Sequence, residues 1–183
     1  LIIKIEEERV LSPGGTEDDK IPDVRISKSP KDTSLGPAIG RAVHRSLNLV
    51  DFKGSDKHIS TICTNCAYEE GIVSSVSDVE KCVRNALSTN VISNLSTNHY
   101  REVPIVGELN GKSYSGYIDL LIEFDDYYLI VDYKTDSISK SNSVESKVEK
   151  YTKQLNVYSQ LLRINLPEKP IKSMFLFLDS NDQ

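Results

Sequence analysis

Three charged residues interrupt or close runs of apolar residues in the segment 116–135. Asp119 lies inside the first run, and Asp132 and Lys134 lie at the end of the second. Side chains alternate across a strand, so Asp132 and Lys134 share one face while Tyr133 points away and offers its backbone carbonyl between them. With an acid from the neighbouring strand, these groups would form an oxygen-rich site that suits Mg²⁺ or Mn²⁺.

A simpler explanation exists for the same three residues. Charged side chains are mostly exposed in folded proteins. Asp119 could therefore mark an irregularity in its strand, and Asp132 and Lys134 could form a solvated strand end beside a turn. The spacing alone leaves both interpretations open.

A wider pattern favours the chemical interpretation. An aspartate followed by Asp-x-Lys at a strand end resembles the PD-(D/E)XK nuclease superfamily. More narrowly, the segment resembles the RecB-family nuclease domain, which is found at the C-terminus of AddA and RecB helicase-nucleases. The matching pieces span roughly residues 36–178 and stand in the family's order. They are His44, Glu102, Gly116-Tyr117-Ile118-Asp119, Asp132-Tyr133-Lys134-Thr135 and Tyr151-x-x-Gln154-x-x-x-Tyr158.

The resemblance implies metal-dependent hydrolysis of DNA and assigns roles to individual residues. Lys134 would position the attacking water or stabilise charge on the phosphate. The implied ligands of Mg²⁺ or Mn²⁺ are His44, Asp119, Asp132 and the Tyr133 carbonyl. The implied catalytic residues are Lys134, Asp119, Asp132, Glu102, Gln154 and Tyr158. The implied DNA-binding residues are Tyr151, Gln154, Lys150 and Lys153.

Several of these residues also have structural explanations. His44 follows a helical stripe of apolar residues, where a histidine is often a hydrogen-bonded residue at the edge of the core. Glu102 could be a charge at a strand edge. Tyr151 and Tyr158 share one face of a helix and could simply pack against the sheet. Without the resemblance, each of these alternatives stands.

The periodicity predicts an α/β fold. Apolar spacing indicates helices over 38–50, 56–69, 77–87, 91–95 and 144–163, with a capping box expected at Ser77 and Glu80. Strands are expected over 101–106, 113–124, 127–133 and 171–178, and Asn110-Gly111 is a hairpin signal. Pro104 places its strand at a sheet edge. We expect a mixed sheet with the long helix on one face and an N-terminal helical cap on the other, as in a restriction-endonuclease-like PD-(D/E)XK core.

Composition divides the chain into two parts. Residues 1–11 have a short strand-like start and an acidic patch, and the residues from there to Ser34 are rich in Pro, Asp, Ser and Lys. We expect residues 1–34 to be a linker or N-terminal extension from a preceding domain. Residues 35–183 form the expected nuclease domain, with a helical part over 35–97 and a catalytic core over 98–183. Because the chain starts with Leu1, we expect it to be a piece of a longer protein.

Charge and cysteine content limit the possible partners. The net charge of −5 counts against a simple nucleic-acid binder, although a nuclease needs only local positive charge. An odd number of cysteines without a secretory signal predicts buried free thiols and a cytoplasmic location. No apolar run is long enough to span a bilayer. The expected partners are single-stranded DNA or a duplex end, a helicase motor in the same full-length chain, and a possible partner subunit.

Two other functions fit the same sequence. One is a catalytically silent DNA-binding module of the same fold, although such modules tend to lose the acids and the lysine. The other is an interaction scaffold in which the charges of the hairpin serve only solubility. Cleavage and DNA binding, measured with and without a divalent metal, separate the three.

Overall fold

The computed structural model describes residues 2–5, 35–95, 98–135 and 144–178, and for 2–5 and 144–150 it describes the backbone only. Helices and strands follow one another along the chain, as the periodicity predicts. In chain order the elements are β1 (Ile2–Ile5), α1 (Leu35–Leu49), α2 (Asp56–Glu69), the 3₁₀ turn η1 (Val73–Ser75), α3 (Val76–Leu87), α4 (Asn90–Ser93), β2 (His99–Leu109), β3 (Lys112–Glu123), β4 (Tyr128–Lys134), α5 (Val144–Asn165) and β5 (Ile171–Phe177).

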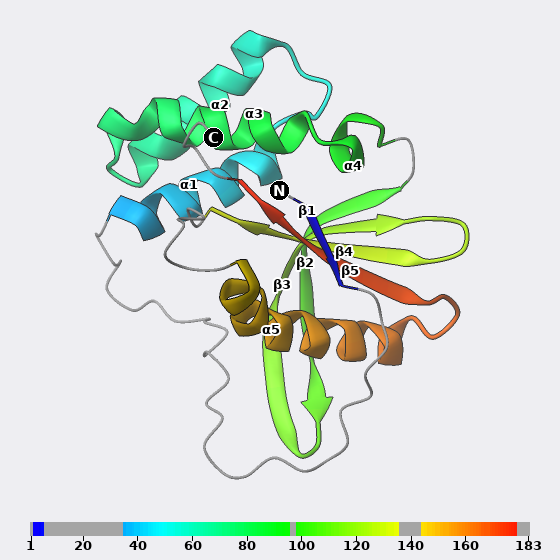
Figure 1. Ribbon diagram of the computed structural model, residues 1–183. Coiled ribbons are helices and arrows are strands. Elements are labelled where there is room, and N and C mark those ends of the chain that lie inside the picture. Colours follow the sequence, from blue (N-terminus) through cyan, green and yellow to red (C-terminus); the bar gives the residue numbers. More distant parts are fainter. Residues whose placement is uncertain (1, 6–34, 96–97, 136–143, 179–183) are drawn as a thin grey trace.

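Five strands form one mixed sheet in the order β1-β5-β4-β3-β2. The pair β4 and β5 is parallel, and the other neighbouring pairs are antiparallel. Helices α1 to α4 lie on one side of the sheet and α5 lies on the other (Figure 1). The expected α/β sandwich with a mixed sheet and an N-terminal helical cap is confirmed.

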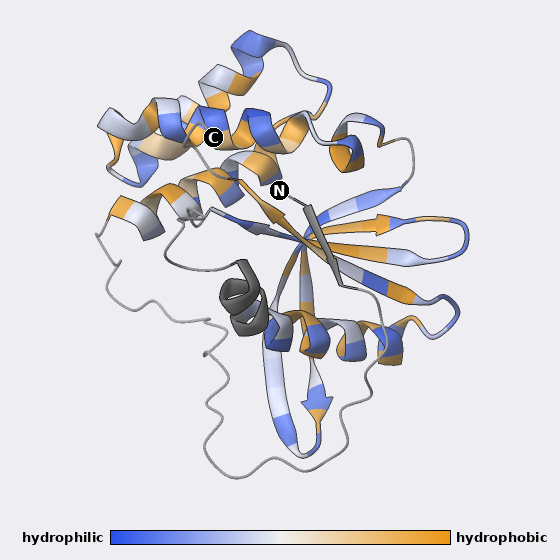
Figure 2. Cartoon of the chain, in the orientation of Figure 1, coloured by the Kyte–Doolittle hydropathy of each residue, from blue (hydrophilic) through white to orange (hydrophobic). Residues whose placement is uncertain are grey.

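Two apolar clusters hold these layers together, one on each face of the sheet. Figure 2 shows apolar residues on the central strands and on the sides of the helices that face them. The first cluster joins α1, α2, α3 and α4 to the sheet and includes Leu120 and Val131. The second joins α5 to the other face and includes Ile118 and Ile130. Central strand β4 is therefore buried on both sides, as its nearly continuous apolar sequence predicts.

The hairpin of β2 and β3 also follows its sequence signals. Asn110 and Gly111 both have positive φ, 51° and 72°, which is the backbone of the turn that Asn-Gly favours. Pro104 lies in β2 at the edge of the sheet, as expected. At Gly107 an added Cβ would lie 2.6 Å from Leu161 Cδ2, so a side chain there would displace the Leu161 side chain of α5.

One expectation about a helix start needs revision. The capping box at Ser77 is wrong, because η1 runs directly into α3 and the helix begins at Val76. The Glu80 carboxylate instead accepts hydrogen bonds from Ser60 and Arg84. Within the expected linker, β1 pairs with β5, while residues 6–34 lie outside the described part of the chain. The division at residue 34 stays a prediction.

Candidate metal centre and active site

The site begins at a point where β2 and β3 both change the face to which their side chains point. Strict alternation would put Ile118 and Leu120 on the same face, yet they belong to opposite apolar clusters. Asp119 lies between them. On β2 the facing residue is Glu102, whose φ of 48° is in the left-handed region that non-glycine residues rarely adopt. The two acids therefore mark a joint irregularity in neighbouring strands.

Asp119 replaces the missing backbone pairing with its side chain. The ladder between β3 and β4 includes Leu120 and Val131 but does not extend to Asp119. Instead, Asp119 Oδ2 accepts a hydrogen bond of 2.7 Å from the backbone N–H of Tyr133. The interpretation of Asp119 as a strand irregularity and its interpretation as a site residue are thus both consistent with the fold.

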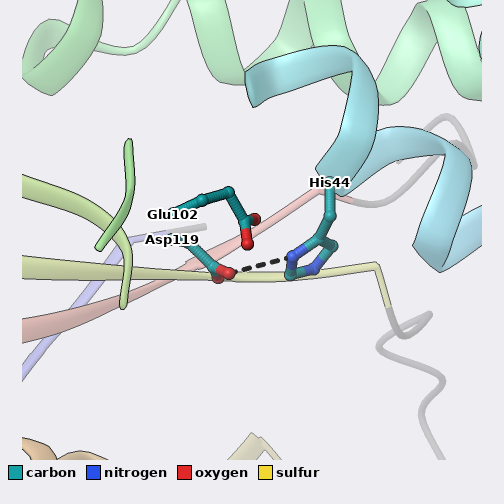
Figure 3. A group of neighbouring side chains, drawn as sticks. All are labelled: His44, Glu102 and Asp119. Carbon is teal, nitrogen blue, oxygen red and sulfur yellow. Dashed lines mark hydrogen bonds and ion pairs between the residues drawn. The ribbon is translucent and has the colours of Figure 1, made fainter. Parts of the chain in front are cut away.

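His44 meets the two acids from the helical layer. Its Nδ1 lies 3.0 Å from Asp119 Oδ1 (Figure 3). One ligand atom from each of His44, Glu102 and Asp119 can be chosen so that all three lie within 4.8 Å of one another. One turn before His44, a Cβ at Gly40 would lie 3.1 Å from Thr135 Oγ1, so the glycine allows α1 to lie close to the end of β4. Imidazole and carboxylate groups in this arrangement can hold a divalent metal ion.

The acids of this cluster determine the protonation of His44. Burial alone would lower the His44 pKa, but the charge of Asp119 and its hydrogen bond outweigh burial and raise the pKa to about 9. Burial, together with the Asp119 charge, raises the pKa of Glu102. Without a metal, the cluster thus compensates for its negative charge by holding a proton on the imidazole.

Asp132 and Lys134 form a second group on the face that α5 covers. Their side chains share that face, as expected, and Lys134 Nζ lies 2.6 Å from Asp132 Oδ2. Asp132 is only 5% exposed, and burial raises its pKa to about 6 against the opposing effect of Lys134. Although the ion pair is close, Asp132 Oδ2 has no well-aligned hydrogen-bond donor among the described residues. The cation beside this buried carboxylate oxygen is the Lys134 ammonium.

The helix α5 supports this second group. Lys134 Nζ lies 4.3 Å from the centre of the Tyr151 ring, which also contacts Phe175. Gln154 Nε2 donates a hydrogen bond of 3.2 Å to the hydroxyl of Tyr158, a side chain that is 2% exposed. The structure thus places Tyr151, Gln154 and Tyr158 on the side of α5 that faces the sheet.

The remaining predicted site residues lie in different surroundings. Lys153 is exposed on α5, while the side chain of Lys150 lies outside the described residues. The ring of Tyr133 is buried on the face of α1, edge-on to His44 at 5.9 Å between ring centres. Asp132 is not in the group of His44, Glu102 and Asp119. Site residues predicted together therefore form two neighbouring groups, and Asp119 connects them through the Tyr133 N–H.

Sequence reasoning missed Arg101, whose guanidinium binds the end of α1. Arg101 Nη1 lies 2.6 Å from the carbonyl oxygen of Val50 and 3.1 Å from that of Asn48. Its position immediately before Glu102 was the only available signal. The three cysteines, by contrast, are buried thiols that form no disulfide, as expected.

The raised His44 pKa leads to a prediction for the metal-free protein. We expect an NMR titration to place the His44 pKa near 9. Asp119→Asn should lower it, because burial and the Lys134 charge, which both lower the His44 pKa, are then opposed mainly by the charge of Asp132. Since the folded pKa exceeds the unfolded one, the stability that His44 contributes is complete below about pH 6.5 and is lost as the pH rises through about 9.

The control for this titration is Asp125→Asn, which removes an exposed carboxylate from the turn between β3 and β4. That variant should titrate at His44 like the wild type. An Asp119→Asn protein with an unchanged His44 pKa would contradict the assignment of Asp119 as the dominant neighbour.

The mixed sheet carries clustered carboxylates and a lysine, and α1 adds a histidine, an arrangement that is consistent with a nuclease fold. A family model described as the PD-(D/E)XK nuclease superfamily matches residues 22–183. The chain belongs to this superfamily.

Part of the chain is also similar to longer curated relatives. It is 31% identical over 127 residues to an ATP-dependent helicase/nuclease subunit of Clostridium perfringens strain SM101, a match that covers 60% of this chain and 10% of that protein. It is 31% identical over 88 residues to the corresponding protein of Desulforamulus reducens, covering 48% of this chain and 7% of the relative. It is 34% identical over 68 residues to the corresponding protein of Clostridioides difficile strain 630, a match that covers 37% of this chain and 5% of that protein. The chain thus matches a tenth or less of the length of these relatives.

A helix that crosses a bilayer must be both long and apolar. None of the helices in the described ranges combines these two properties.

Proposed function

We propose that this chain is a metal-dependent nuclease domain that hydrolyses phosphodiester bonds in DNA. The observation that carries the proposal is the position of Asp119. One of its oxygens lies 3.0 Å from His44 Nδ1, and the other binds the N–H of Tyr133, the residue between Asp132 and Lys134. Asp119 therefore connects the candidate metal ligand His44 to the strand that carries Asp132 and Lys134, which supports the proposal.

The donor set fits Mg²⁺ or Mn²⁺. Its oxygen ligands would come from Asp119, Asp132 and the Tyr133 carbonyl, with His44 as the nitrogen ligand and Glu102 close by. The chemistry of the donor set supports this fit, since carboxylate and carbonyl oxygens are the ligands that these ions prefer. When bound, such an ion supplies Lewis acidity and lowers the pKa of a coordinated water.

The residues of the chain divide the remaining tasks. Lys134 is held by Asp132 and by the ring of Tyr151, so its ammonium is preorganised to donate to a phosphate oxygen or to the attacking water. Glu102 is a half-buried acceptor that can take a hydrogen bond from water near His44. In hydrolysis, the water oxygen forms a bond to phosphorus, and the bond from phosphorus to the leaving oxygen breaks.

DNA contacts are assigned to two lysines of α5. Lys153 is exposed and suits a phosphate oxygen, and we assign the same task to Lys150. Tyr158 is buried and hydrogen-bonded to Gln154. This pair therefore acts mainly by fixing α5 against the sheet and less by contacting the DNA. Tyr151 acts by positioning Lys134, whose ammonium lies over the Tyr151 ring.

The proposal extends to the full-length protein by analogy with the relatives, which are ATP-dependent helicase/nuclease subunits. We propose that this domain follows a helicase motor in the same chain and receives single-stranded DNA or a duplex end. In this proposal it works with a second subunit in double-strand-break repair in the cytoplasm. Sequencing the full reading frame that contains this domain tests for the helicase motor. A frame without helicase motifs would contradict the proposal that a motor precedes the domain.

The test of the function is a cleavage assay on the purified chain. End-labelled single-stranded and duplex DNA are incubated with Mg²⁺, with Mn²⁺ or with EDTA, and bound and cleaved DNA are measured in the same samples. We expect cleavage with either metal and none with EDTA. DNA binding without cleavage at any metal concentration would instead support a catalytically silent module.

A further inference from the structure

We propose that Arg101 is a positioning residue for the candidate metal centre: it holds the end of α1 so that His44 meets Glu102 and Asp119. This inference rests on the proposed function for its metal-binding consequence. Its structural consequence, the placement of His44 against Asp119, can be measured without a metal.

Arg101 contacts the carbonyl groups at the end of α1. The last carbonyls of a helix have no partner within the helix, and a positive charge there is favourable. Arg101 Nη1 lies 2.6, 3.1 and 3.3 Å from the carbonyl oxygens of Val50, Asn48 and Leu47. A cation from the sheet therefore binds the carboxyl end of α1.

Ring contacts add to the hydrogen bonds of Arg101 at the end of α1. The guanidinium carbon of Arg101 lies 3.8 Å from the centre of the Phe52 ring, and Phe52 stacks on His99 at 5.5 Å between ring centres. Both His99 and Arg101 belong to the start of β2, while Phe52 follows α1. The segment after α1 is thus held by hydrogen bonds and by ring contacts to the same strand.

Arg101 is connected to the candidate metal centre through the backbone of β2 and through α1. Arg101 directly precedes Glu102, and the positive φ of Glu102 separates the direction of Arg101 from that of Val103, which packs in the cluster beneath α5. This backbone feature sends the guanidinium toward α1 while the Glu102 carboxylate joins His44. Asn48, whose carbonyl Arg101 binds, lies one helical turn after His44.

The connection between Arg101 and His44 runs through α1. In the part of the chain that the structure describes, the Arg101 contacts and the pair of His44 with Asp119 both join α1 to the sheet. No hydrogen bond or ion pair within the described ranges joins Arg101 to His44 directly. Arg101 therefore affects His44 by fixing where α1 lies, and a displacement of α1 would separate His44 from Asp119.

The experiment compares Arg101→Gln, Arg101→Lys and a matched control. Arg45→Gln serves as the control because Arg45 is on α1 but pairs with Glu69 of α2 at the surface, 2.7 Å apart. Mn²⁺ affinity is measured by calorimetry. We expect Arg101→Gln to weaken Mn²⁺ binding by about 10-fold or more, the scale for residues that orient metal ligands. Arg101→Lys should recover part of the loss, and Arg45→Gln should bind like the wild type.

A second measurement is made in EDTA and does not depend on the metal. Melting temperatures are compared for the wild type, Arg101→Gln, His44→Ala and the double variant. If Arg101 positions His44 against Asp119, the two losses are less than additive, whereas His44→Ala combined with Arg45→Gln is additive. Additive losses with Arg101→Gln, or unchanged Mn²⁺ affinity in a folded Arg101→Gln protein, would reduce Arg101 to a helix cap. A wild type that binds no Mn²⁺ would overturn the metal centre, while the EDTA cycle would still decide the role of Arg101.

Discussion

Lys134→Ala should lower the single-turnover rate of DNA cleavage by about 10²-fold or more, the scale for losing one preorganised electrostatic group. The lysine cannot ligate a metal while it is protonated, so its partner is the phosphate or the attacking water. Mn²⁺ affinity should therefore stay nearly unchanged, or improve slightly because a like charge is removed. The measurement pairs Mn²⁺ calorimetry with cleavage on the same protein.

Two further variants make this result specific. Lys134→Arg should not restore cleavage, because a planar guanidinium cannot replace a compact ammonium in the space between Asp132 and the Tyr151 ring. Lys57→Ala removes an exposed lysine from α2 and should cleave normally. The fold should survive the loss of Lys134, since the buried Asp132 can take up a proton or a metal ion. A Lys134→Ala protein that cleaves at the wild-type rate would remove the lysine from the mechanism.

Loss of the two aspartates should abolish saturable Mn²⁺ binding. Asp119→Asn and Asp132→Asn should each weaken Mn²⁺ binding by more than about 10²-fold, because even residues behind the ligands contribute 10- to 100-fold. The double variant should show no saturable site and no cleavage. Asparagine keeps the shape of the side chain, and Asn at position 119 can still accept the hydrogen bond from the Tyr133 N–H. The expected loss therefore comes from charge and not from unfolding.

Calorimetry and circular dichroism on the same samples check this prediction. Asp125→Asn is the matched control, because it removes an exposed carboxylate from the turn between the same two strands. Undiminished Mn²⁺ binding in the folded double variant would show that the ion, if bound, lies elsewhere in the chain.

Local sequence patterns determined most of the fold. The apolar spacing predicted α2 over 56–69 with the bounds that the structure has, and the Asn110-Gly111 turn followed from the positive φ that these residues tolerate. Alternation placed Asp132 and Lys134 on one face, where they form an ion pair. These features depend on neighbours in the chain, so a pattern of a few residues is sufficient to predict them.

The capping box shows where a local pattern is insufficient. Ser77 and Glu80 have the right spacing, but the 3₁₀ turn η1 continues into α3, so the helix is already formed at Ser77. The Glu80 carboxylate is engaged by Ser60 of α2 and by Arg84. The pair with Arg84 is a local i,i+4 contact within α3, but the contact with Ser60 joins two helices, so the sequence around Glu80 does not predict it.

The geometry of the candidate site depends mainly on tertiary structure. The sequence supplied the residue types of His44, Glu102 and Asp119, and a family resemblance supplied their roles. Only the packing of α1 on the sheet brings His44 within 3.0 Å of Asp119, a residue 75 positions away. The positive φ of Glu102 has no local cause, because glutamate does not favour that region. It persists because the Arg101 contacts on one face and the α5 cluster on the other require β2 to change direction between them.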